Sequence, residues 1–469
     1  MSIRYDGSSI DVLEGLEAVR VRPGMYIGST GTRGLHHLLW EILDNAVDES
    51  LAGYCTDIWV TINPDQSITV EDNGRGMPVD IHPKMKIPTV RVIYTILHAG
   101  GKFKEGAYQT AGGLHGVGAS VVNALSKHLK AEVFRNGKIY VDVYENGGKP
   151  ITKLTKTGNL PTVGKTEKTG SRITFLPDDT IFETTKWDIE MIENRLKEVS
   201  YLNKGLKIHF FYQEKKKQKE KVFFSEDGIC GFLKEMNQDK NNLTDLVYFS
   251  GESKETGLTA EIALQISDEE GEHVMGYCNN IATTEGGTHL TGFRSGLTRL
   301  INTYISKEFN LKETPDGKDI RRGLTAIISL KHHNPQYEGQ TKTKLSNSDA
   351  KSAMEEIVIQ AGTLYFDRHL SDLKAIVDNA IQAYKRRQKE TSKKVNIAKD
   401  TFSISHKLAD CFSKKREECE IFLVEGDSAG GTSKIARNRK TQAVLPLRGK
   451  IFASTSLTCL PQGLFHWNS

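Results

Sequence analysis

The 469-residue chain lacks several features that define specialised classes of protein. No apolar run is long enough to span a bilayer. Near the start, Ser8, Asp11 and Glu14 interrupt the apolar core that a signal peptide requires. The six cysteines show neither CxxC nor zinc spacing, which predicts reduced thiols rather than a disulfide framework. These absences favour a cytoplasmic location and no membrane partner.

The chain also lacks a strong excess of charge of one sign. Its 63 basic and 59 acidic residues leave a net charge of +4, which is too small to predict nucleic-acid binding by itself. We find no internal repeat and no long low-complexity tract. A chain of 469 residues is long for one domain, so two or three domains are expected.

What the sequence does contain is three separated segments suited to one nucleotide site. The first is a predicted amphipathic helix over 35–54, on which His37, Glu41, Asn45 and Asp48 share one face. Glu41 could act as a general base toward water, with His37 holding its carboxylate. Asn45 offers a neutral oxygen to Mg²⁺, a cation that prefers oxygen ligands. A solvated acidic helix face is the simpler alternative for this segment alone.

The second segment is a predicted strand over 67–71 that ends in the turn Asp72-Asn-Gly-Arg-Gly76. Asn-Gly is a common turn pair, so an ordinary hairpin turn is one interpretation. The functional interpretation places Asp72 at a pocket floor, accepting a hydrogen bond from the exocyclic amine of adenine. A buried acceptor left unpaired costs about 1–3 kcal/mol, which makes one Asp selective. Gly76 would let the base approach the backbone closely.

The third segment is the glycine-rich loop 112–118, followed by a predicted helix over 119–128. Consecutive backbone N–H groups in such a loop can surround phosphate oxygens, and a helix N-terminus favours anions. The loop lacks the Gly-Lys-Ser/Thr ending of a Walker motif and the context of a dinucleotide fingerprint. A flexible linker is the alternative, but the order of the three segments favours a site that binds and hydrolyses ATP with Mg²⁺.

These segments, together with Thr169-Gly-Ser171, resemble the sequence boxes of the GHKL (Bergerat) ATPase fold. Gyrase, the ninety-kilodalton heat-shock chaperones, histidine kinases and mismatch-repair ATPases share that fold. Within this superfamily the chain resembles the bacterial DNA gyrase B family, from its start to about Ile451. The paralogous topoisomerase IV B family shares most of the motifs, and Lys407–Cys411 leans toward gyrase. The matching stretches are Tyr5–Ile10, Arg22–Gly28, Leu97–Phe103, Glu285–His289, Gln340–Lys342 and Val424–Gly431.

The resemblance implies an α+β architecture in three parts. A GHKL ATPase sandwich would be followed by a ribosomal S5-like transducer domain, built around a βαβ unit, and then by a partial TOPRIM α/β region. Lys215–Lys221 is expected to be a solvated hairpin tip beside the first domain boundary. The expected boundaries are an N-terminal dimerisation arm at 1–20, an ATPase domain at 21–221, a transducer domain at 222–394 and an incomplete TOPRIM region at 395–469.

The resemblance also assigns roles in the site. Lys342 would reach the γ-phosphate with help from Gln340, beside Glu41 and His37. Ser171 stands where the family usually has Thr, so the adenine site should be slightly looser. Arg135 matches the position that holds aminocoumarin inhibitors. The expected nucleotide contacts are Asn45, Asp48, Asp72, Arg75, Gly76, Met77, Pro78, Lys102, Tyr108, Gly113, Leu114, His115, Gly116, Val117, Gly118 and Ser171.

Partners follow from the same resemblance. Tyr5 and Ile10 would cross to the partner protomer and close its nucleotide pocket, in a homodimer that forms when ATP binds. The chain would use ATP to pass double-stranded DNA and supercoil it negatively, together with a separate gyrase A-like protein that cleaves DNA, in an assembly with two copies of each. The alternatives are a topoisomerase IV B protein, a chaperone- or repair-type ATPase clamp, and a fragment that binds ATP without full topoisomerase activity.

DNA contacts are expected in two places. Arg321, Arg322 and the basic helix end at 385–394 could line a DNA cavity, although a solvated linker is the default interpretation of such a charge run. In the TOPRIM region the candidate contacts to the DNA backbone are Lys434, Arg437, Arg439, Arg448 and Lys450.

The third region departs from the family after Ile451. Glu425 is expected to bind Mg²⁺, but a complete TOPRIM site needs a later Asp-x-Asp pair. The tail 452–469 contains no Asp, Glu, Lys or Arg. A single carboxylate is a poor magnesium site. We therefore expect a truncated or frameshifted product, with half a TOPRIM fold and an exposed sheet edge.

Overall fold

The computed structural model describes residues 12–101, 113, 116–214, 217–308, 314–401, 408–413 and 415–447. The chain forms two compact units, residues 1–384 and 385–469, and each is described by itself. Several residues singled out from the sequence lie outside the described residues: Tyr5, Ile10, Lys102, Tyr108, Leu114, His115, Arg448, Lys450 and the tail 452–469.

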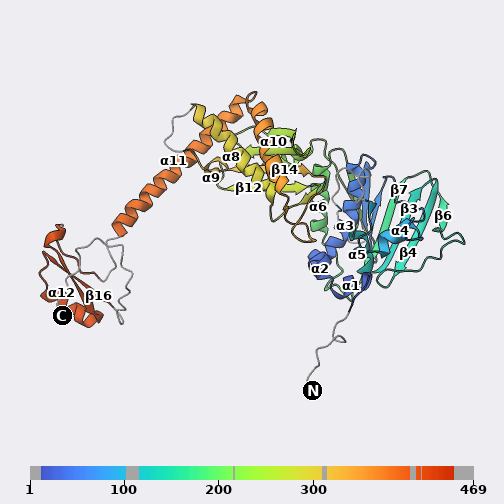
Figure 1. Ribbon diagram of the computed structural model, residues 1–469, viewed down its shortest axis with the longest axis horizontal. Helices are drawn as coiled ribbons and strands as arrows, with labels where there is room; N and C mark the ends of the chain where they lie inside the picture. Colours follow the sequence, from blue (N-terminus) through green and yellow to red (C-terminus); the bar gives the residue numbers. More distant parts are fainter. Residues whose placement is uncertain are drawn as a thin grey trace, which may run out of the picture. The chain divides into compact units, whose positions relative to one another are not determined.

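The first unit begins with a large mixed sheet in the order β5-β4-β3-β7-β2-β1-β8-β9, with β6 paired to β4. Figure 1 labels β3, β4, β6 and β7 of this sheet. Among the described strands, β1 and β8 run parallel and the other neighbours run antiparallel. Buried and partly exposed residues alternate along β1 and β2, as expected for a sheet with one covered face. The strands are β1 Asp57–Ile62, β2 Ile68–Asp72, β3 Ser126–Arg135, β4 Lys138–Glu145, β5 Lys149–Pro150, β6 Thr162–Lys165, β7 Gly170–Pro177, β8 Lys207–Glu214 and β9 Lys217–Phe223.

Helices pack against this sheet and complete a two-layer sandwich, in which α3 and α5 lie beside the strands (Figure 1). The apolar stripe of α3 is fully buried in the shared core, where Leu35, Leu39 and Leu43 join Ile58 and Phe175. This confirms the predicted amphipathic helix, although it spans Thr32–Leu51 and not 35–54. The helices are α1 Leu16–Val21, α2 Gly24–Ile27, α3 Thr32–Leu51, α4 Thr89–Thr95, α5 Gly118–Ala124 and α6 Ile189–Leu202.

One predicted element is too long. The helix expected over 119–128 ends at Ala124, and Ser126 already begins β3. The reason is long-range pairing: His128 lies opposite Glu145 of β4 and Leu176 of β7. Two neighbouring strands thus compete successfully with local helix propensity.

A second sheet in the first unit has the order β10-β11-β14-β12-β13. Strands β12 and β14 pair in parallel and are connected through α8, which gives the βαβ unit expected from the sequence. Helices α8 and α10 bury one face of the sheet. The elements are α7 Ile229–Met236, β10 Val247–Glu252, β11 Thr259–Ile266, β12 Glu272–Cys278, β13 Ile281–Ala282, α8 Thr288–Glu308, α9 Gly317–Ile320, β14 Leu324–Lys331, α10 Ser348–Phe366 and the first part of α11, which spans Leu370–Thr401 and continues past Tyr384 into the second unit.

The two sheets of the first unit are joined by a small apolar cluster. Leu202, at the end of α6, packs with Ile229 and Leu233 of α7 and with Tyr277 and Ile327 of the second sheet. The predicted hairpin next to this junction is confirmed, because Glu214 of β8 pairs with Lys217 of β9. Helix α6 therefore packs both on its own sheet and on the neighbouring layer.

The second unit holds one small strand–helix–strand element. Strands β15, Glu420–Glu425, and β16, Gln442–Leu447, pair in parallel, and α12, Gly426–Ala436, connects them; a short 3₁₀ helix spans Arg416–Glu418. Ile421, Phe422 and Leu423 remain partly exposed. Among the described helices of both units, none combines the length and the apolarity needed to cross a membrane.

The packing of Gly34 in α3 yields a stability prediction. A Cβ atom at this position would lie 1.7 Å from the Ser29 carbonyl oxygen, so the backbone would have to move. We expect Gly34→Ala to lower the free energy of unfolding by about 2 kcal/mol or more, although Ala normally favours a helix by up to about 1 kcal/mol. Chemical denaturation measures this difference.

Gly24, in α2, supplies the matched control. A Cβ atom there meets nothing within 4 Å, so Gly24→Ala should change the free energy of unfolding by less than about 1 kcal/mol. A Gly34→Ala protein as stable as the parent would contradict the packing argument.

Candidate active site

The catalytic candidates lie on one face of α3, as the helical spacing predicts. Glu41 and Asp48 are buried, at 7% and 1% exposure, and Asn45 between them is exposed. The Asn45 Nδ2 amide donates to the Glu41 carbonyl at 2.9 Å, which fixes the orientation of the carboxamide. The face is therefore a wall of a site, with one neutral polar group turned outward, rather than a fully solvated acidic surface.

Two cationic or polar side chains approach the Glu41 carboxylate. His37 Nε2 lies 3.3 Å from Oε1, and Lys342 Nζ lies 3.6 Å from the same oxygen. His37 is one helical turn earlier on α3, whereas Lys342 comes from the loop after β14. The ammonium group of Lys342 favours the ionised form of the carboxylate, which is the form that can accept a proton from water. His37 Nε2 lies close to the carboxylate but makes no hydrogen bond in this geometry.

Lys342 is itself almost fully buried, at 4% exposure. Burial opposes its charge, but the Glu41, Asp44 and Asp48 carboxylates outweigh burial and raise the pKa of its ammonium group. Gln340 is half-buried in the same loop, two residues earlier. The structure therefore brings a permanently charged lysine from the second sheet to the acidic face of α3.

The described part of the glycine-rich loop contacts the same face. The Gly113 N–H donates to Asp48 Oδ2 at 3.3 Å, and Gly116 adopts a left-handed conformation with φ of 63°. Gly118 begins α5, and a Cβ atom at Gly118 would lie 2.0 Å from Glu41 Oε2. An alanine at 118 would displace the Glu41 carboxylate, because the backbone of α5 begins directly against it.

Asp72 and Ser171 face each other across β2 and β7. Asp72 is 9% exposed, and its Oδ1 accepts a hydrogen bond from the Gly74 N–H at 2.8 Å. The Met77 N–H donates to Ser171 Oγ at 3.3 Å, so the serine hydroxyl fixes the turn that follows Asp72. Burial raises the pKa of Asp72 to about 7, only partly offset by the Gly74 hydrogen bond. The Asp72 carboxyl group is therefore a hydrogen-bond acceptor in a buried environment of low polarity.

Gly76 is constrained by the protein itself, in addition to the close approach of a base that the sequence predicts. A Cβ atom at Gly76 would lie 2.8 Å from the Gly170 carbonyl oxygen and 3.0 Å from that of Phe134, and φ is 72°. Neighbouring strand ends, and not only a ligand, therefore require glycine here. Gly170 is constrained by the same turn, because its Cβ would lie 1.9 Å from the Asp72 carbonyl oxygen.

Arg75 and Arg135 shape a cavity beside Asp72. Arg75 binds Glu49 through two hydrogen bonds of 3.0 and 2.9 Å, and its guanidinium lies 4.0 Å above the Tyr54 ring. Arg135 Nη1 donates to the Gly76 carbonyl at 2.6 Å. Met77 is half-buried and Pro78 exposed on the other side of the turn. The cavity has a volume of about 360 Å³ and is lined by Tyr54, Gly74, Arg75, Arg135, Asn136 and Thr169.

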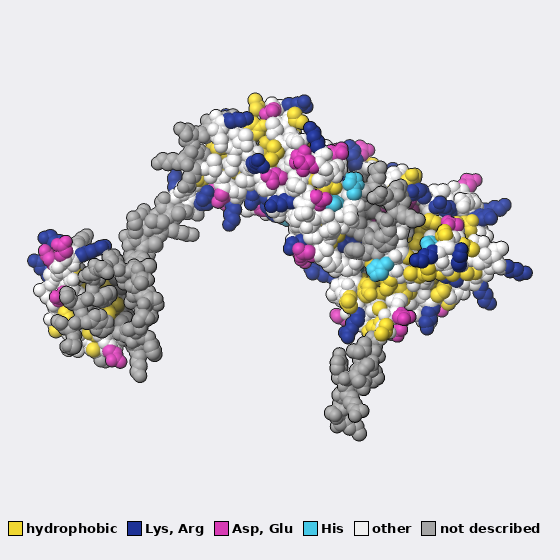
Figure 2. Space-filling model, viewed as in Figure 1, with side chains coloured by type: hydrophobic (Ala, Val, Ile, Leu, Met, Phe, Trp, Pro, Cys, Tyr) yellow, Lys and Arg dark blue, Asp and Glu magenta, His cyan; other side chains and the backbone are white. Residues whose placement is uncertain are grey.

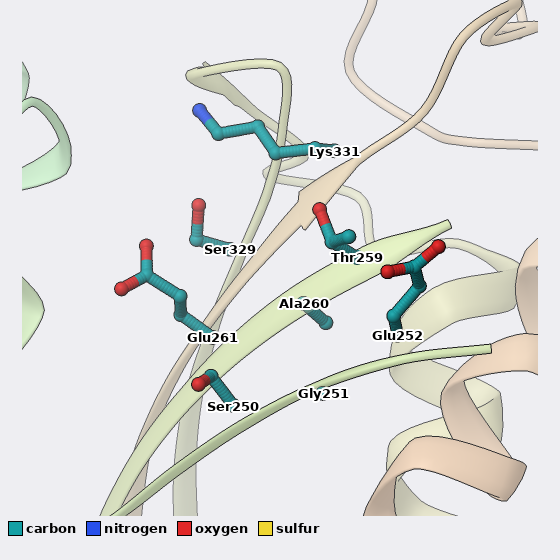
Figure 3. A pocket seen from close by; sticks show the side chains of 8 residues that line it. All are labelled: Ser250, Gly251, Glu252, Thr259, Ala260, Glu261, Ser329 and Lys331. Atoms are coloured by element: carbon teal, nitrogen blue, oxygen red, sulfur yellow. The ribbon is translucent and has the colours of Figure 1, made fainter. Parts of the chain in front are cut away.

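A second cavity, of about 430 Å³, lies on the second sheet, where β10, β11 and β14 present polar side chains (Figure 3). Lys331, Ser329 and Glu261 extend to the same side of these strands. Burial lowers the pKa of Lys331 to about 8. This cavity is lined by residues of the second sheet alone, unlike the site on α3.

Two functional candidates were missed from the sequence. Asp44, also on α3, is partly buried, and Arg195 of α6 approaches it with Nη2 3.4 Å from Asp44 Oδ1. Burial raises the pKa of Asp44, although Arg195 and Lys342 oppose the shift. The sequence gives no sign that Arg195 is buried, because Asp44, the residue with which it pairs, is 151 residues away.

The DNA candidates in the second sheet have carboxylate partners. Arg321 pairs with Glu272 and donates to Thr298 Oγ1 at 3.1 Å. Arg322 lies 2.9 Å from Glu270 and donates to Asn379 Oδ1 at 2.9 Å. Figure 2 shows basic and acidic side chains interspersed over the visible face of the layer that contains α8 and β12. Both guanidinium groups thus have a structural role within the sheet and its flanking helices, which weakens their case as DNA contacts.

In the second unit, Glu425 ends β15 and is exposed, and Lys434 lies half-buried on α12. Within the described residues of the whole chain, no group of three or more His, Cys, Asp or Glu side chains is arranged to hold a metal ion. Metal binding at Glu425 therefore remains a prediction from the sequence.

The fold and the site together define the class. A mixed sheet is covered by helices, and one of these helices carries a buried acid and an oriented Asn. A buried Asp lies at a strand turn, and a glycine loop lies against the acid. This is the arrangement of the GHKL ATPases. Comparison with known proteins gives the same class: residues 30–181 match the family described as "Histidine kinase-, DNA gyrase B-, and HSP90-like ATPase". Residues 228–396 match the family "DNA gyrase B".

Individual relatives agree. The DNA gyrase B protein of Clostridium acetobutylicum is 48% identical over 458 residues, 95% of this chain and 70% of the relative. The DNA topoisomerase 4 B protein of Staphylococcus aureus is 48% identical over 460 residues, 95% of this chain and 68% of the relative. Among solved structures, the 43K ATPase domain of Thermus thermophilus gyrase B in complex with an aminocoumarin superposes with a TM-score of 0.67 and 38% identity, covering 81% of this chain and 98% of that one.

A topoisomerase IV ATP-binding domain from Francisella tularensis, solved with a small-molecule inhibitor, gives a TM-score of 0.65 and 32% identity over 80% of this chain and 98% of that one. The chain belongs to the DNA gyrase B/topoisomerase IV B family. It is accordingly an ATP-hydrolysing subunit of a type II topoisomerase.

The buried Asp72 predicts an unusual dependence of stability on pH. Its pKa is 3.8 in the unfolded chain and about 7 in the folded protein. Between these values the folded state holds a proton that the unfolded state has lost, so this contribution to stability fades as pH rises through 7. Asp72→Asn should therefore stabilise the nucleotide-free protein at pH 8, by a few kcal/mol at about 1.4 kcal/mol per pKa unit, and much less near pH 4.

Asp65 gives a control of opposite sign. Hydrogen bonds from Ser67 lower its pKa, so Asp65→Asn should give no gain in stability at pH 8 and should cost stability at neutral pH. Thermal unfolding between pH 4 and 8 compares both variants with the parent. An Asp72→Asn protein whose advantage does not grow with pH would show that Asp72 is not held as described.

Proposed function

We propose that the site on α3 hydrolyses ATP with Glu41 as the general base, and that this cycle drives the passage of double-stranded DNA. The observation that supports this proposal most directly is the environment of the buried Glu41 carboxylate, whose Oε1 lies 3.3 Å from His37 Nε2 and 3.6 Å from Lys342 Nζ. A carboxylate kept ionised in a buried site can orient a water molecule and remove its proton. The attacking oxygen then forms a bond to the γ-phosphorus, and the bond to the β–γ bridging oxygen breaks.

Lys342 would act on the other side of the reaction. Its ammonium group can stabilise the negative charge that spreads over the γ-phosphoryl oxygens in the transition state. Because Lys342 comes from the loop after β14, this contact makes hydrolysis depend on the second sheet as well as the first. Gln340 in the same loop would assist at the phosphate.

The remaining nucleotide contacts follow the geometry of the site. Asp72 would accept a hydrogen bond from the adenine amine, supported by the Ser171 hydroxyl that fixes the adjacent turn. Gly113 and the segment 116–118 would face the phosphates with backbone N–H groups. A magnesium ion would be held by Asn45 and the phosphates: the carboxamide is oriented by its hydrogen bond to Glu41, and oxygen donors with several waters suit this ion. When bound, it neutralises phosphate charge.

The partners are proposed from the family. We propose an ATP-dependent homodimer and a separate DNA-cleaving protein of the gyrase A kind, with both acting on DNA in the cytoplasm. Arg135, beside the cavity of about 360 Å³, would contact an aminocoumarin, the class of compound bound to the Thermus thermophilus relative. The domain boundaries at 20, 221 and 394 and the metal role of Glu425 remain predictions.

Negative supercoiling is the preferred activity, and topoisomerase IV-type relaxation and decatenation is the second candidate. The identities to a gyrase B and to a topoisomerase 4 B protein are both 48%. The Lys407–Cys411 stretch favours the gyrase alternative. A supercoiling assay with relaxed plasmid and a purified gyrase A-type protein separates the two activities.

Glu41→Gln tests the catalytic proposal. Removing a general base costs about 10²–10⁴ in rate, so ATP turnover should fall at least about 100-fold. Nucleotide affinity should stay within a few-fold, because the adenine and phosphate contacts remain. Turnover and nucleotide binding are measured with and without linear DNA.

Glu132→Gln, on β3, is the control, since its side chain is 13% exposed and pairs with Lys130. It should leave turnover within a few-fold of the parent. Undiminished turnover in Glu41→Gln would refute the assignment of the base. A parent protein that binds ATP but shows no turnover would favour the binding-fragment alternative.

The end of α11 offers a test of DNA contact. Lys385 and Lys389 are exposed on this helix. Reversing both charges should reduce DNA-stimulated ATP turnover and lower the salt dependence of DNA binding by about two phosphate contacts, while basal turnover stays unchanged. Lys149→Glu with Lys165→Glu, which changes the same charge at the exposed strands β5 and β6, should have neither effect. Unaltered stimulation and salt dependence in the helix variant would leave α11 as a solvated linker.

A further inference from the structure

The connection between β12 and β13 is a two-residue turn of unusual content. Cys278 pairs with Ile281, so Asn279 and Asn280 alone form the turn. Their φ angles are 49° and 66°, the left-handed values that a type I′ turn requires and that Asn tolerates. Both residues are nevertheless buried, at 1% and 3% exposure. A turn of this kind normally lies at the surface, so its buried polar groups need hydrogen-bond partners within the protein.

Asn279 holds the beginning of the Lys342 loop. Its Nδ2 donates to the His332 carbonyl at 2.8 Å, and the His332 N–H donates back to Asn279 Oδ1 at 2.9 Å. Tyr337, further along the same loop, donates its hydroxyl to the Cys278 carbonyl at 3.0 Å. The loop that carries Lys342 is thus tied to the turn at two points.

Asn280 holds the other side of the junction. Its Oδ1 accepts from Lys331 Nζ at 2.7 Å, and its Nδ2 donates to Asn203 Oδ1, just after α6, at 2.6 Å. Lys331 comes from β14 and extends over the polar face of the second sheet (Figure 3). The carbonyl of Asn280 accepts from Arg195 Nη2 at 3.3 Å. The side chain and the carbonyl of Asn280 therefore contact residues from both layers, from β14 on one side and from α6 and its C-terminal end on the other.

Arg195 completes the connection to the active site. The same Nη2 lies 3.4 Å from Asp44 Oδ1, and Nη1 lies 3.4 Å from Glu198. Burial opposes its charge, but Asp44 and Glu198 raise the pKa of the guanidinium. Asp44 lies one helical turn after Glu41 on α3. A continuous path of polar contacts thus runs from α3 through Arg195 and the turn to the Lys342 loop.

We infer that Arg195 is a positioning residue that acts through the Asn279–Asn280 turn to hold the Lys342 loop against Glu41. Arg195 touches the Asp44 carboxylate and the Asn280 carbonyl with one nitrogen, so the separation between α3 and the turn is fixed by one planar group. The inference rests on the proposed roles of Glu41 and Lys342. It adds a residue on α6 that contacts neither of them but sets the distance between them.

The test is Arg195→Gln in the full chain, measured as ATP turnover against ATP concentration. We expect kcat to fall about tenfold, since misplacing a catalytic group by about 1 Å can cost up to about a hundredfold. KM should stay within twofold, because the proposed adenine, magnesium and glycine-loop contacts lie outside the Lys342 loop, and Lys342 is proposed to act on charge that develops in the transition state. In a Lys342→Met background the same substitution should add less than a twofold loss.

Lys331→Met probes the same path from the second sheet. It removes the hydrogen bond to Asn280 without touching α3 or α6. It should lower kcat in the same direction as Arg195→Gln, and the double variant should lose less than the product of the two separate effects. This variant carries the test if Arg195→Gln fails to fold.

Arg91→Gln is the matched control for loss of a buried ion pair. Arg91 and Arg195 have the same side-chain exposure of 13%, and Arg91 pairs with Asp142 at 2.8 Å, within the first sheet and its helices. Arg91→Gln should lower the melting temperature and leave kcat within twofold. A purely structural Arg195 would behave in the same way.

The inference is overturned if Arg195→Gln leaves kcat unchanged, or if its loss of kcat is as large in the Lys342→Met background as in the parent. It is also overturned if the Lys331→Met and Arg195→Gln losses multiply. Failure of the underlying function would be recognised separately, because Glu41→Gln would then retain full turnover.

Discussion

The structure depends on keeping several carboxylates of one helix out of water. Glu41 and Asp48 are buried on α3 and Asp44 is partly buried between them, and such groups are stable as anions only if cations or hydrogen bonds accompany them. The cations come from outside the helix: Lys342 from the loop after β14 and Arg195 from α6. The charge balance of α3 therefore depends on a lysine that the second sheet supplies. The first layer by itself would hold an excess of buried negative charge.

Local patterns in the sequence were sufficient for much of the first layer. The face of α3, the strand before Asp72 and the turn after it were predicted because apolar spacing and Asn-Gly pairs act over a few residues. The family resemblance is confirmed by the relatives. Elements whose bounds depend on distant strands were harder to predict. Helix α5 ends at Ala124 because the residues that follow form β3, which pairs with β4 and β7.

The residues that sequence reasoning missed share one physical property, a partner far along the chain. Arg195 reads as an exposed charge until α3 and the second sheet close around it. Gly118 was expected to contact the nucleotide, but its close approach to the Glu41 carboxylate was not predicted. Conversely, Arg321 and Arg322 read as a basic patch, but Glu272 and Glu270 lie beside them in the folded chain. A run of charged residues in the sequence shows which charges are present, whereas the fold decides which of them form ion pairs.

The costly features of this molecule gather where its two sheets meet. Lys342, Asn279 and Asn280 are buried there and adopt left-handed backbone conformations. Such costs persist only where surrounding contacts outweigh them. The same carboxylates and cations line the nucleotide site that we propose. A triphosphate bound beside Lys342 would redistribute the charge that holds the two layers together, and the proposal therefore couples nucleotide binding to the contact between the two sheets.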